Sequence, residues 1–166
     1  IERFRSGEGF AWGDHDTDVS VGCERFFRPG YVAHLVSTWL PAVDGLVERL
    51  QLGIAVADVG CGLGSSTRIL AETYPASAVV GYDNDPTSIE LADKLTAEAG
   101  LNGRVEFAIA AAADFPGNGL GLVTTFDCLH DMGDPLAAAR HIRSTLADDG
   151  VWLIVEPYAG DSVSDN

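Results

Sequence analysis

The stretch that decides the fold is Ala57-Asp58-Val59-Gly60-Cys61-Gly62-Leu63-Gly64-Ser65-Ser66, where an apolar run breaks into three alternating glycines and then into a helical pattern. This order predicts a strand, a tight loop and the start of a helix. Alternating glycines suit such a loop because they adopt backbone angles that a side chain would obstruct. They also leave room for a ligand to approach the main chain closely.

A second apolar run, residues 77–82, ends at Asp83, nineteen positions after Gly64. At that distance an acid at the tip of the next parallel strand accepts hydrogen bonds from ribose hydroxyls. We therefore predict a nucleoside site. Ser65 stands where the dinucleotide fingerprint requires glycine or alanine, and the carboxylate of Asp58 would repel a pyrophosphate but attract an ammonium and a sulfonium. S-adenosylmethionine is a ligand with both of these cationic groups.

Strand and helix patterns alternate through the rest of the chain. We expect helices between five strands, which the sequence places at 54–59, 78–82, 105–109, 122–126 and 151–155. The pairs Asp85-Pro86 and Asp134-Pro135 each combine a helix cap with a first-turn proline. Strands separated by helices imply right-handed crossovers and an α/β, doubly wound parallel sheet that binds ligands at the carboxyl ends of its strands.

The N-terminal part follows a different pattern. Residues 1–20 show no sustained period, so we expect a loop or arm there. From Tyr31 to Leu50 apolar residues recur at steps of three and four, which predicts an amphipathic helix that Pro41 divides or kinks. We therefore divide the chain into an arm with helices over 1–50 and a Rossmann-like domain over 51–166. The substrate lid is either the 1–28 arm or absent from this chain.

Asp58, Gly60, Gly62 and Gly64 match an acid followed by G-x-G-x-G, and in this the sequence resembles the class I S-adenosylmethionine-dependent methyltransferases. The resemblance covers roughly residues 50 to 160 and implies a Rossmann-like sheet of order 3-2-1-4-5 with S-adenosyl-L-methionine as cofactor. Two departures are Ala111 and Gly121, where many relatives carry acids; Asp114 is the nearest substitute for the first. The implied cofactor-binding residues are Asp58, Gly60, Cys61, Gly62, Gly64, Asp83, Asn84, Ala112, Ala113, Asp114, Phe126 and Asp127.

Leu129-His130-Asp131 lies just past the fourth strand and resembles small-molecule O-methyltransferases, in which the histidine is the general base and a glutamate after strand five orients it. His130 and Glu156 match those two positions. We predict methyl transfer to oxygen or nitrogen of a small molecule. Three alternatives stay open: His130 as a pocket wall, a non-catalytic ligand-sensing or regulatory domain that retains the fold, and, more distantly, a nicotinamide oxidoreductase.

Composition narrows the partners. The net charge of −15 disfavours binding of nucleic acid by this region. Three widely spaced cysteines without zinc-site spacing indicate free thiols, no metal site and a cytoplasmic location. No apolar run approaches the roughly 18 residues of a membrane span, so we expect no membrane partner.

A closer resemblance is carried by Glu24-Arg25-Phe26-Phe27, by Trp39-Leu40-Pro41-Ala42 and by the segment 128–135. It points to bacterial methyltransferase-domain proteins with an upstream winged-helix segment, and it implies a homodimer. Such proteins add a two-stranded hairpin after strand five, whereas this chain stops eleven residues after Val155. Because it also starts at Ile1, we expect it to be part of a longer protein.

Overall fold

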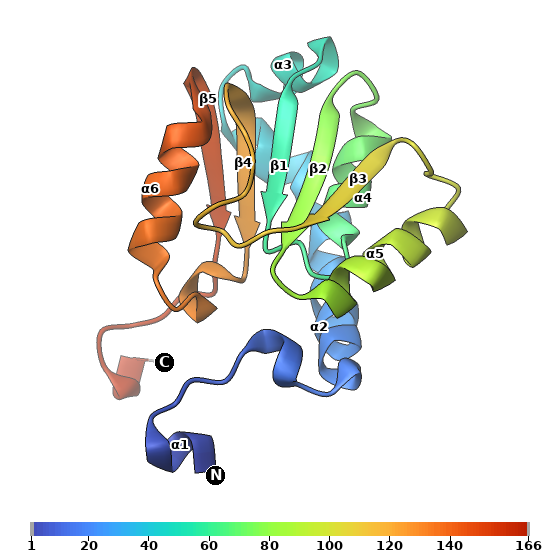
Figure 1. Cartoon of the computed structure of the whole chain (residues 1–166). Coiled ribbons are helices and arrows are strands. Elements are labelled where there is room, and N and C mark those ends of the chain that lie inside the picture. The colour runs from blue at the N-terminus through green and yellow to red at the C-terminus, as the bar shows by residue number, and fades with distance from the viewer. Residues whose placement is uncertain (1, 166) are drawn as a thin grey trace.

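The computed structural model describes residues 2–165. Its centre is a parallel sheet of order β3-β2-β1-β4-β5, which confirms the predicted fold class and strand order (Figure 1). The strands are β1 (Ala55–Val59), β2 (Ala78–Asp83), β3 (Val105–Ile109), β4 (Leu120–Phe126) and β5 (Leu146–Val155). Each lies within a few residues of its predicted range, except that β5 begins five residues early, beyond an irregular register between Leu120 and Leu122.

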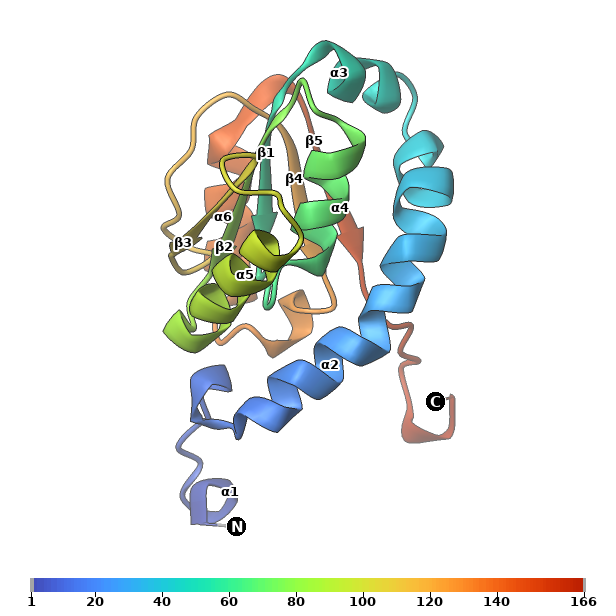
Figure 2. The ribbon, with the colours of Figure 1, turned by 90° about the vertical axis from the view of Figure 1, so that its right-hand side faces the viewer.

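Helices cover both faces of the sheet. Helix α4 (Ser65–Thr73) and helix α5 (Pro86–Glu98) connect β1 to β2 and β2 to β3, and α6 (Pro135–Thr145) connects β4 to β5. Seen with the sheet edge-on, α4 lies on one face and α6 on the other (Figure 2). Both predicted caps are present. Asp85 accepts hydrogen bonds from the backbone N–H of Thr87 and Ser88, and Asp134 accepts one from Ala137.

Two hydrophobic clusters fill the space between the sheet and its helices. One joins residues of β1, β2 and α4 to fully buried leucines from the N-terminal helices, among them Leu35 and Leu50. The other lies on the α6 face, around Phe115, Val123 and Ile142. Burying these side chains on both faces fixes the strand ends, and therefore the loops that follow them, in one arrangement.

The N-terminal prediction was partly wrong. Residues 1–20 are not a plain arm. They include α1 (Glu2–Ser6), a 3₁₀ turn (Trp12–Asp14) and the start of α2 (Thr17–Gly30). Helix α2 is capped by Asp16 and continues into a π-helical segment over 31–39. As predicted, Pro41 marks a division, since a 3₁₀ turn at 40–42 separates this helix from α3 (Leu46–Leu52).

The N-terminal segment crosses the carboxyl ends of the strands. In Figure 1 the strand arrows point toward α2 and the turn before it. Among the described residues that follow β5, the structure has a 3₁₀ turn at Val163–Asp165 and no further strand. The carboxyl ends of the strands therefore face the segment that runs from the 3₁₀ turn through α2, while residues 31–39 continue alongside α4 (Figure 2).

Candidate functional site

The glycine loop follows β1 and leads into α4, as predicted. Gly60 and Gly64 both have positive φ, +73° and +75°, in the left-handed region that favours glycine. A Cβ at Gly64 would stand 2.5 Å from Cζ of Phe107, and one at Gly60 would stand 2.6 Å from Sγ of Cys128. These glycines are required by backbone conformation and by close packing together.

Asp83 ends β2 at the predicted position and holds the loop. Its Oδ2 accepts a hydrogen bond from the N–H of Gly62 at 2.8 Å, and its Oδ1 accepts one from Asp85 at 3.0 Å. Asp83 is 8% exposed, and burial raises the pKa of its carboxyl above the ordinary value. The same carboxylate therefore braces the glycine loop and faces the cavity described next.

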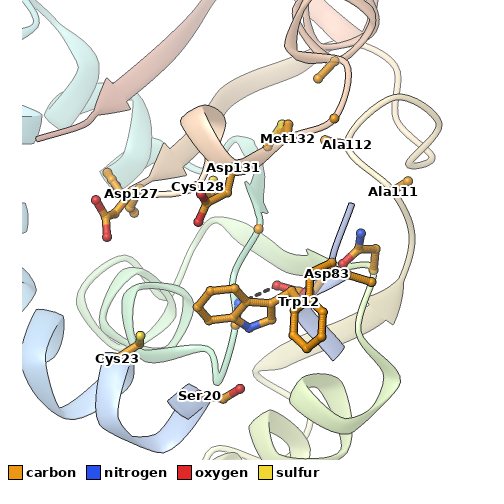
Figure 3. Close-up of a pocket in the computed structure, with 18 of the residues that line it drawn as sticks. Trp12, Ser20, Cys23, Asp83, Ala111, Ala112, Asp127, Cys128, Asp131 and Met132 are labelled. Carbon is orange, nitrogen blue, oxygen red and sulfur yellow. Dashed lines mark hydrogen bonds between the residues drawn. The ribbon is translucent and has the colours of Figure 1, made fainter. Parts of the chain in front are cut away.

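A cavity of about 1160 Å³ opens at the carboxyl ends of the strands (Figure 3). Leu63, Asp131 and Met132 line it together with several predicted residues. The predicted cofactor residues that line the cavity are Gly60, Gly62, Asp83, Asn84, Ala112, Ala113, Phe126 and Asp127. Most of the predicted binding set is therefore gathered around one hollow.

Asp58 does not line this cavity. Only 1% of it is exposed, and its carboxylate accepts hydrogen bonds from Ser66 and Thr67, both at 2.6 Å, and from Thr124 at 2.7 Å. Burial raises the pKa of Asp58, while these three bonds act in the opposite direction. The expectation that Asp58 faces the ligand is corrected: it lies beneath the loop and fastens α4 and β4 to β1.

Three other predicted residues also lie outside the cavity lining. Cys61 is 8% exposed, and burial raises the pKa of its thiol. Gly64 occupies the cap position of α4. Asp114 accepts a hydrogen bond from the N–H of Ala111 at 3.1 Å and so closes the turn after β3. These residues shape the loops that carry the lining atoms.

The N-terminal segment supplies a wall of the cavity that no motif identified. Phe10, Trp12, Phe27 and Tyr31 all line the hollow. Within the predicted lid, the residues that line the cavity run from Arg3 to Phe27. A pair of aromatic residues at 26–27 followed by Tyr31 was the available sequence signal.

Glu24 ties this wall to the glycine loop. Its carboxylate accepts a hydrogen bond from Ser65 and lies 3.7 Å from a guanidinium nitrogen of Arg68. Arg68 in turn donates to the carbonyl of Leu63 at 2.7 Å. Helix α2 is therefore connected to the first turn of α4 through a partly buried ion pair.

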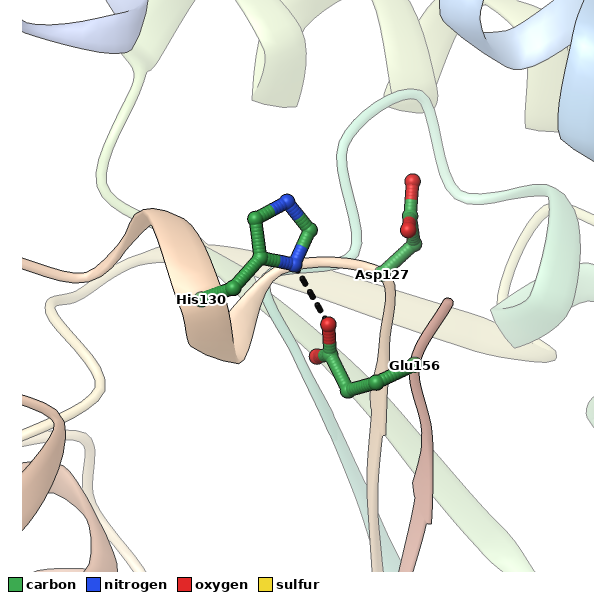
Figure 4. Close-up of side chains that lie close together, drawn as sticks. All are labelled: Asp127, His130 and Glu156. Atoms are coloured by element: carbon green, nitrogen blue, oxygen red, sulfur yellow. Dashed lines mark hydrogen bonds and ion pairs between the residues drawn. The ribbon is translucent and has the colours of Figure 1, made fainter. Parts of the chain in front are cut away.

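His130 and Glu156 meet as predicted. Nδ1 of His130 lies 2.5 Å from Oε2 of Glu156, whose other oxygen accepts the N–H groups of Cys128 and Leu129 (Figure 4). The hydrogen bond that His130 donates to the Glu156 carboxylate raises the pKa of the imidazole above 6.5. The imidazole stands beside the cavity and not in its lining. Its Nε2 lies 3.6 Å from Oδ1 of Asp131, which does line it.

Asp127, His130 and Glu156 bring potential metal-ligand atoms within 4.8 Å of one another. Asp127 has a φ of +53°, the one non-glycine positive value recorded over residues 2–165. Both oxygens of Glu156 already accept hydrogen bonds. A metal ion bound at this cluster would therefore compete with these hydrogen bonds for the Glu156 carboxylate.

Comparison with known proteins identifies the family. Residues 50–165 match the family model described as a methyltransferase domain. The chain belongs to this family. The prediction of a class I S-adenosylmethionine-dependent methyltransferase is confirmed, while the upstream winged-helix segment stays a prediction.

Similar sequences are methyltransferases with different acceptors. The domain is 27% identical over 154 residues to 2-methyl-6-phytyl-1,4-hydroquinone methyltransferase of Synechocystis, covering 89% of this chain and 46% of that protein. It is 39% identical over 85 residues to trans-aconitate 2-methyltransferase of Streptomyces avermitilis, covering 49% and 32%. The chain therefore spans less than half the length of these two curated relatives.

Solved structures share the fold. The [4+2]-cyclase SpnF has a TM-score of 0.60 at 28% identity, covering 69% of this chain and 43% of that one. YcgJ of Bacillus subtilis has a TM-score of 0.62 at 25% identity, covering 69% and 48%. Over residues 2–165, the methyltransferase domain has no helix with the length and apolar character needed to span a bilayer.

Proposed function

We propose that the protein transfers the methyl group of S-adenosylmethionine to oxygen or nitrogen of a small molecule. The observation that carries this proposal is the cavity at the carboxyl ends of the strands, lined by the glycine loop and Asp83, in a chain of the methyltransferase family.

The lining residues suit a nucleoside with an amino acid tail. No heavy atom lies within 4 Å of the place where a Cβ of Gly62 would stand, so a ligand can lie against this backbone. We assign the ribose to Asp83 and Asn84 and the adenine to the backbone at Ala112 and Ala113. When bound, S-adenosylmethionine supplies an electrophilic methyl group on a sulfonium.

In the proposed reaction His130 is the general base that accepts a proton from the methyl acceptor. Glu156 fixes the ring through Nδ1 and leaves Nε2 on the side of Asp131, a cavity residue. A histidine accepts a proton only in its neutral form. Because the pKa of His130 is raised, turnover that depends on this base should increase with pH through a midpoint above about 6.5.

We also retain the expectations of a cytoplasmic protein, a homodimer and a small-molecule acceptor instead of nucleic acid. The net charge of −15 supports the exclusion of polyanions. Cys23, Cys61 and Cys128 are free in the structure, in keeping with a reducing compartment. The homodimer rests on the family resemblance alone, and sedimentation velocity would test it.

Isothermal titration with S-adenosylhomocysteine tests the cofactor site. Ala111 lines the cavity and is exposed, so Ala111→Trp should fill the space for the ligand and weaken binding at least tenfold. Ala97→Trp, on the exposed side of α5 and outside the lining, is the matched control and should bind normally. Absence of binding to the unmodified protein would refute the proposal. Binding without turnover of any acceptor would favour the ligand-sensing alternative.

A further inference from the structure

We propose that the methyl acceptor is an amine on a flat apolar body, such as an arylalkylamine, and not a carboxylate or phosphate ester. This inference rests on the proposed function, because it concerns the acceptor end of the same cavity. Four residues of that end carry the argument: Phe27, Tyr31, Asp127 and Asp131.

The cavity has two ends. Asp83 and Asn84 mark the end assigned to the nucleoside, at the tip of β2. Figure 3 shows Asp127 well separated from Asp83, on the far side of the hollow. Asp127 directly follows β4, and it lines the same cavity as Phe27 and Tyr31 of the N-terminal helices. This second end is where an acceptor has room to approach the reacting methyl group.

The acceptor end is acidic. Asp127 and Asp131 both line it, and burial raises the pKa of Asp127, as do the neighbouring Glu156 and Asp131. The positive charge of His130 acts against these effects and lowers the pKa of Asp127. Even with His130 protonated, the three carboxylates of this cluster outnumber its single imidazolium.

Positive charge is scarce in the rest of the lining. Arg3 is the one lysine or arginine among the residues that line the cavity, all of which the structure describes. It is already engaged, since it lies 3.7 Å from Asp14 and 5.9 Å from the ring centre of Phe10. The carboxylate of Glu24 is balanced separately by Arg68. A carboxylate or phosphate on the acceptor would therefore meet like charges with no free cation to compensate them.

Aromatic rings give this end a flat apolar wall. Phe27 and Tyr31 stack with ring centres 6.5 Å apart, and Tyr31 lies 5.5 Å from Phe126. Aromatic faces bind flat apolar bodies and also attract ammonium groups. A wall of rings beside two carboxylates matches a molecule with an aromatic body and a cationic nitrogen.

Methyl transfer to the amine needs only the side chains of this end and the proposed cofactor. The ammonium form docks against Asp127 and Asp131, then loses one proton to Nε2 of His130 by way of Asp131. The nitrogen lone pair attacks the methyl carbon as the carbon–sulfur bond breaks, and the bonding electrons go to sulfur. The products are a methylated ammonium ion, a neutral thioether and a protonated histidine that returns its proton to solvent.

Three probes with one aromatic body test the acceptor class: 2-phenylethylamine, 2-phenylethanol and phenylacetate. Each is titrated into the protein saturated with S-adenosylhomocysteine. We expect the amine to bind at least tenfold more tightly than the carboxylate, with the alcohol between them. Equal or tighter binding of phenylacetate, or no binding of any probe at millimolar concentration, would overturn the inference.

Charge variants locate the preference. Asp127→Asn and Asp131→Asn should each weaken amine binding several-fold, and Asp131→Lys should narrow or reverse the preference over phenylacetate. Asp93→Asn removes an equal charge from the exposed side of α5 and should change nothing. An affinity for the amine that neither Asp127→Asn nor Asp131→Asn changes would also refute the inference. Asp127→Asn and Asp131→Asn are compared only after each is shown to bind S-adenosylhomocysteine. Failure of the unmodified protein to bind S-adenosylhomocysteine would instead refute the proposed function, so the two failures are distinguishable.

Discussion

Replacing Asp58 by alanine should destabilise the domain severely, although the residue does not line the cavity. The change removes an acceptor shared by Ser66, Thr67 and Thr124, whose side chains are at most 4% exposed. Each buried hydroxyl that loses its partner costs about 1–3 kcal/mol, and costs at neighbouring sites are not additive. We expect a loss of about 3–5 kcal/mol in the free energy of unfolding.

Asparagine at position 58 should be far better tolerated. Its side-chain oxygen can replace Oδ2 and accept from Ser66 and Thr67, while its NH₂ group can donate to the hydroxyl of Thr124. All three hydroxyls then keep a partner, and no charge is buried. We expect Asp58→Asn to cost no more than about 1 kcal/mol.

Guanidinium denaturation of the two variants measures both numbers. An asparagine variant as unstable as the alanine variant, or an alanine variant that loses less than about 1 kcal/mol, would refute the reasoning. The same variants also show whether the charge of Asp58 contributes to ligand binding or whether the residue only supports the loop. If Asp58 acts only beneath the loop, Asp58→Asn should bind S-adenosylhomocysteine almost as tightly as the unmodified protein.

Three further predictions concern pH, packing and the histidine. Because the pKa of Asp58 is raised in the folded state, the folded protein binds more protons than the unfolded chain. The unmodified protein should therefore lose stability relative to Asp58→Asn as pH rises from about 4. Denaturation at several pH values measures this, and a stability difference that does not change with pH would contradict it. Gly64→Ala should lower the free energy of unfolding by about 2–4 kcal/mol, because φ is positive there and the new Cβ would collide with Phe107. Gly100→Ala is the control and should cost about 1 kcal/mol, because φ is equally positive but no atom lies nearby. Equal shifts in melting temperature would contradict this. Glu156→Gln should lower the pKa of His130 toward 6.5 in an NMR titration, and an unchanged midpoint would remove Glu156 as its cause.

Local patterns were sufficient to predict the strands and helices of a parallel sheet, and the family resemblance implied the strand order. The cap and proline pairs at 85–86 and 134–135 and the alternation of strand and helix patterns correspond to elements within a few residues of the prediction. These signals act over short distances and agree with one another, so tertiary contacts did not need to override them.

Helix α2 was missed although its apolar residues Val19, Cys23, Phe26 and Phe27 recur at helical spacing, because Gly and Pro interrupt the pattern. It contains Gly22 and Pro29, and none of its residues is buried. Its position depends on contacts from distant parts of the chain, above all Glu24 with Ser65 and Arg68. A periodicity argument cannot detect contacts between residues that lie 41 positions apart.

The cofactor site was predicted in outline but not in the direction of each side chain. An acid at a strand end can face a ligand or the protein interior, and sequence spacing does not distinguish these cases. For Asp58 the deciding partners are Ser66 and Thr67 on α4 and Thr124 on β4, which meet only when the sheet has formed. Asp83 was placed correctly at its strand tip, where it also proved to brace Gly62.

We propose that the glycine loop and the tip of β2 bind the nucleoside of S-adenosylmethionine. Titration of the ¹⁵N-labelled protein with S-adenosylhomocysteine, followed by amide chemical shifts, tests it most directly. We expect saturable changes that are largest at Gly60, Gly62, Asn84 and Ala112. Saturation with changes confined to residues remote from the cavity, or spectra that do not respond at millimolar ligand, would contradict it.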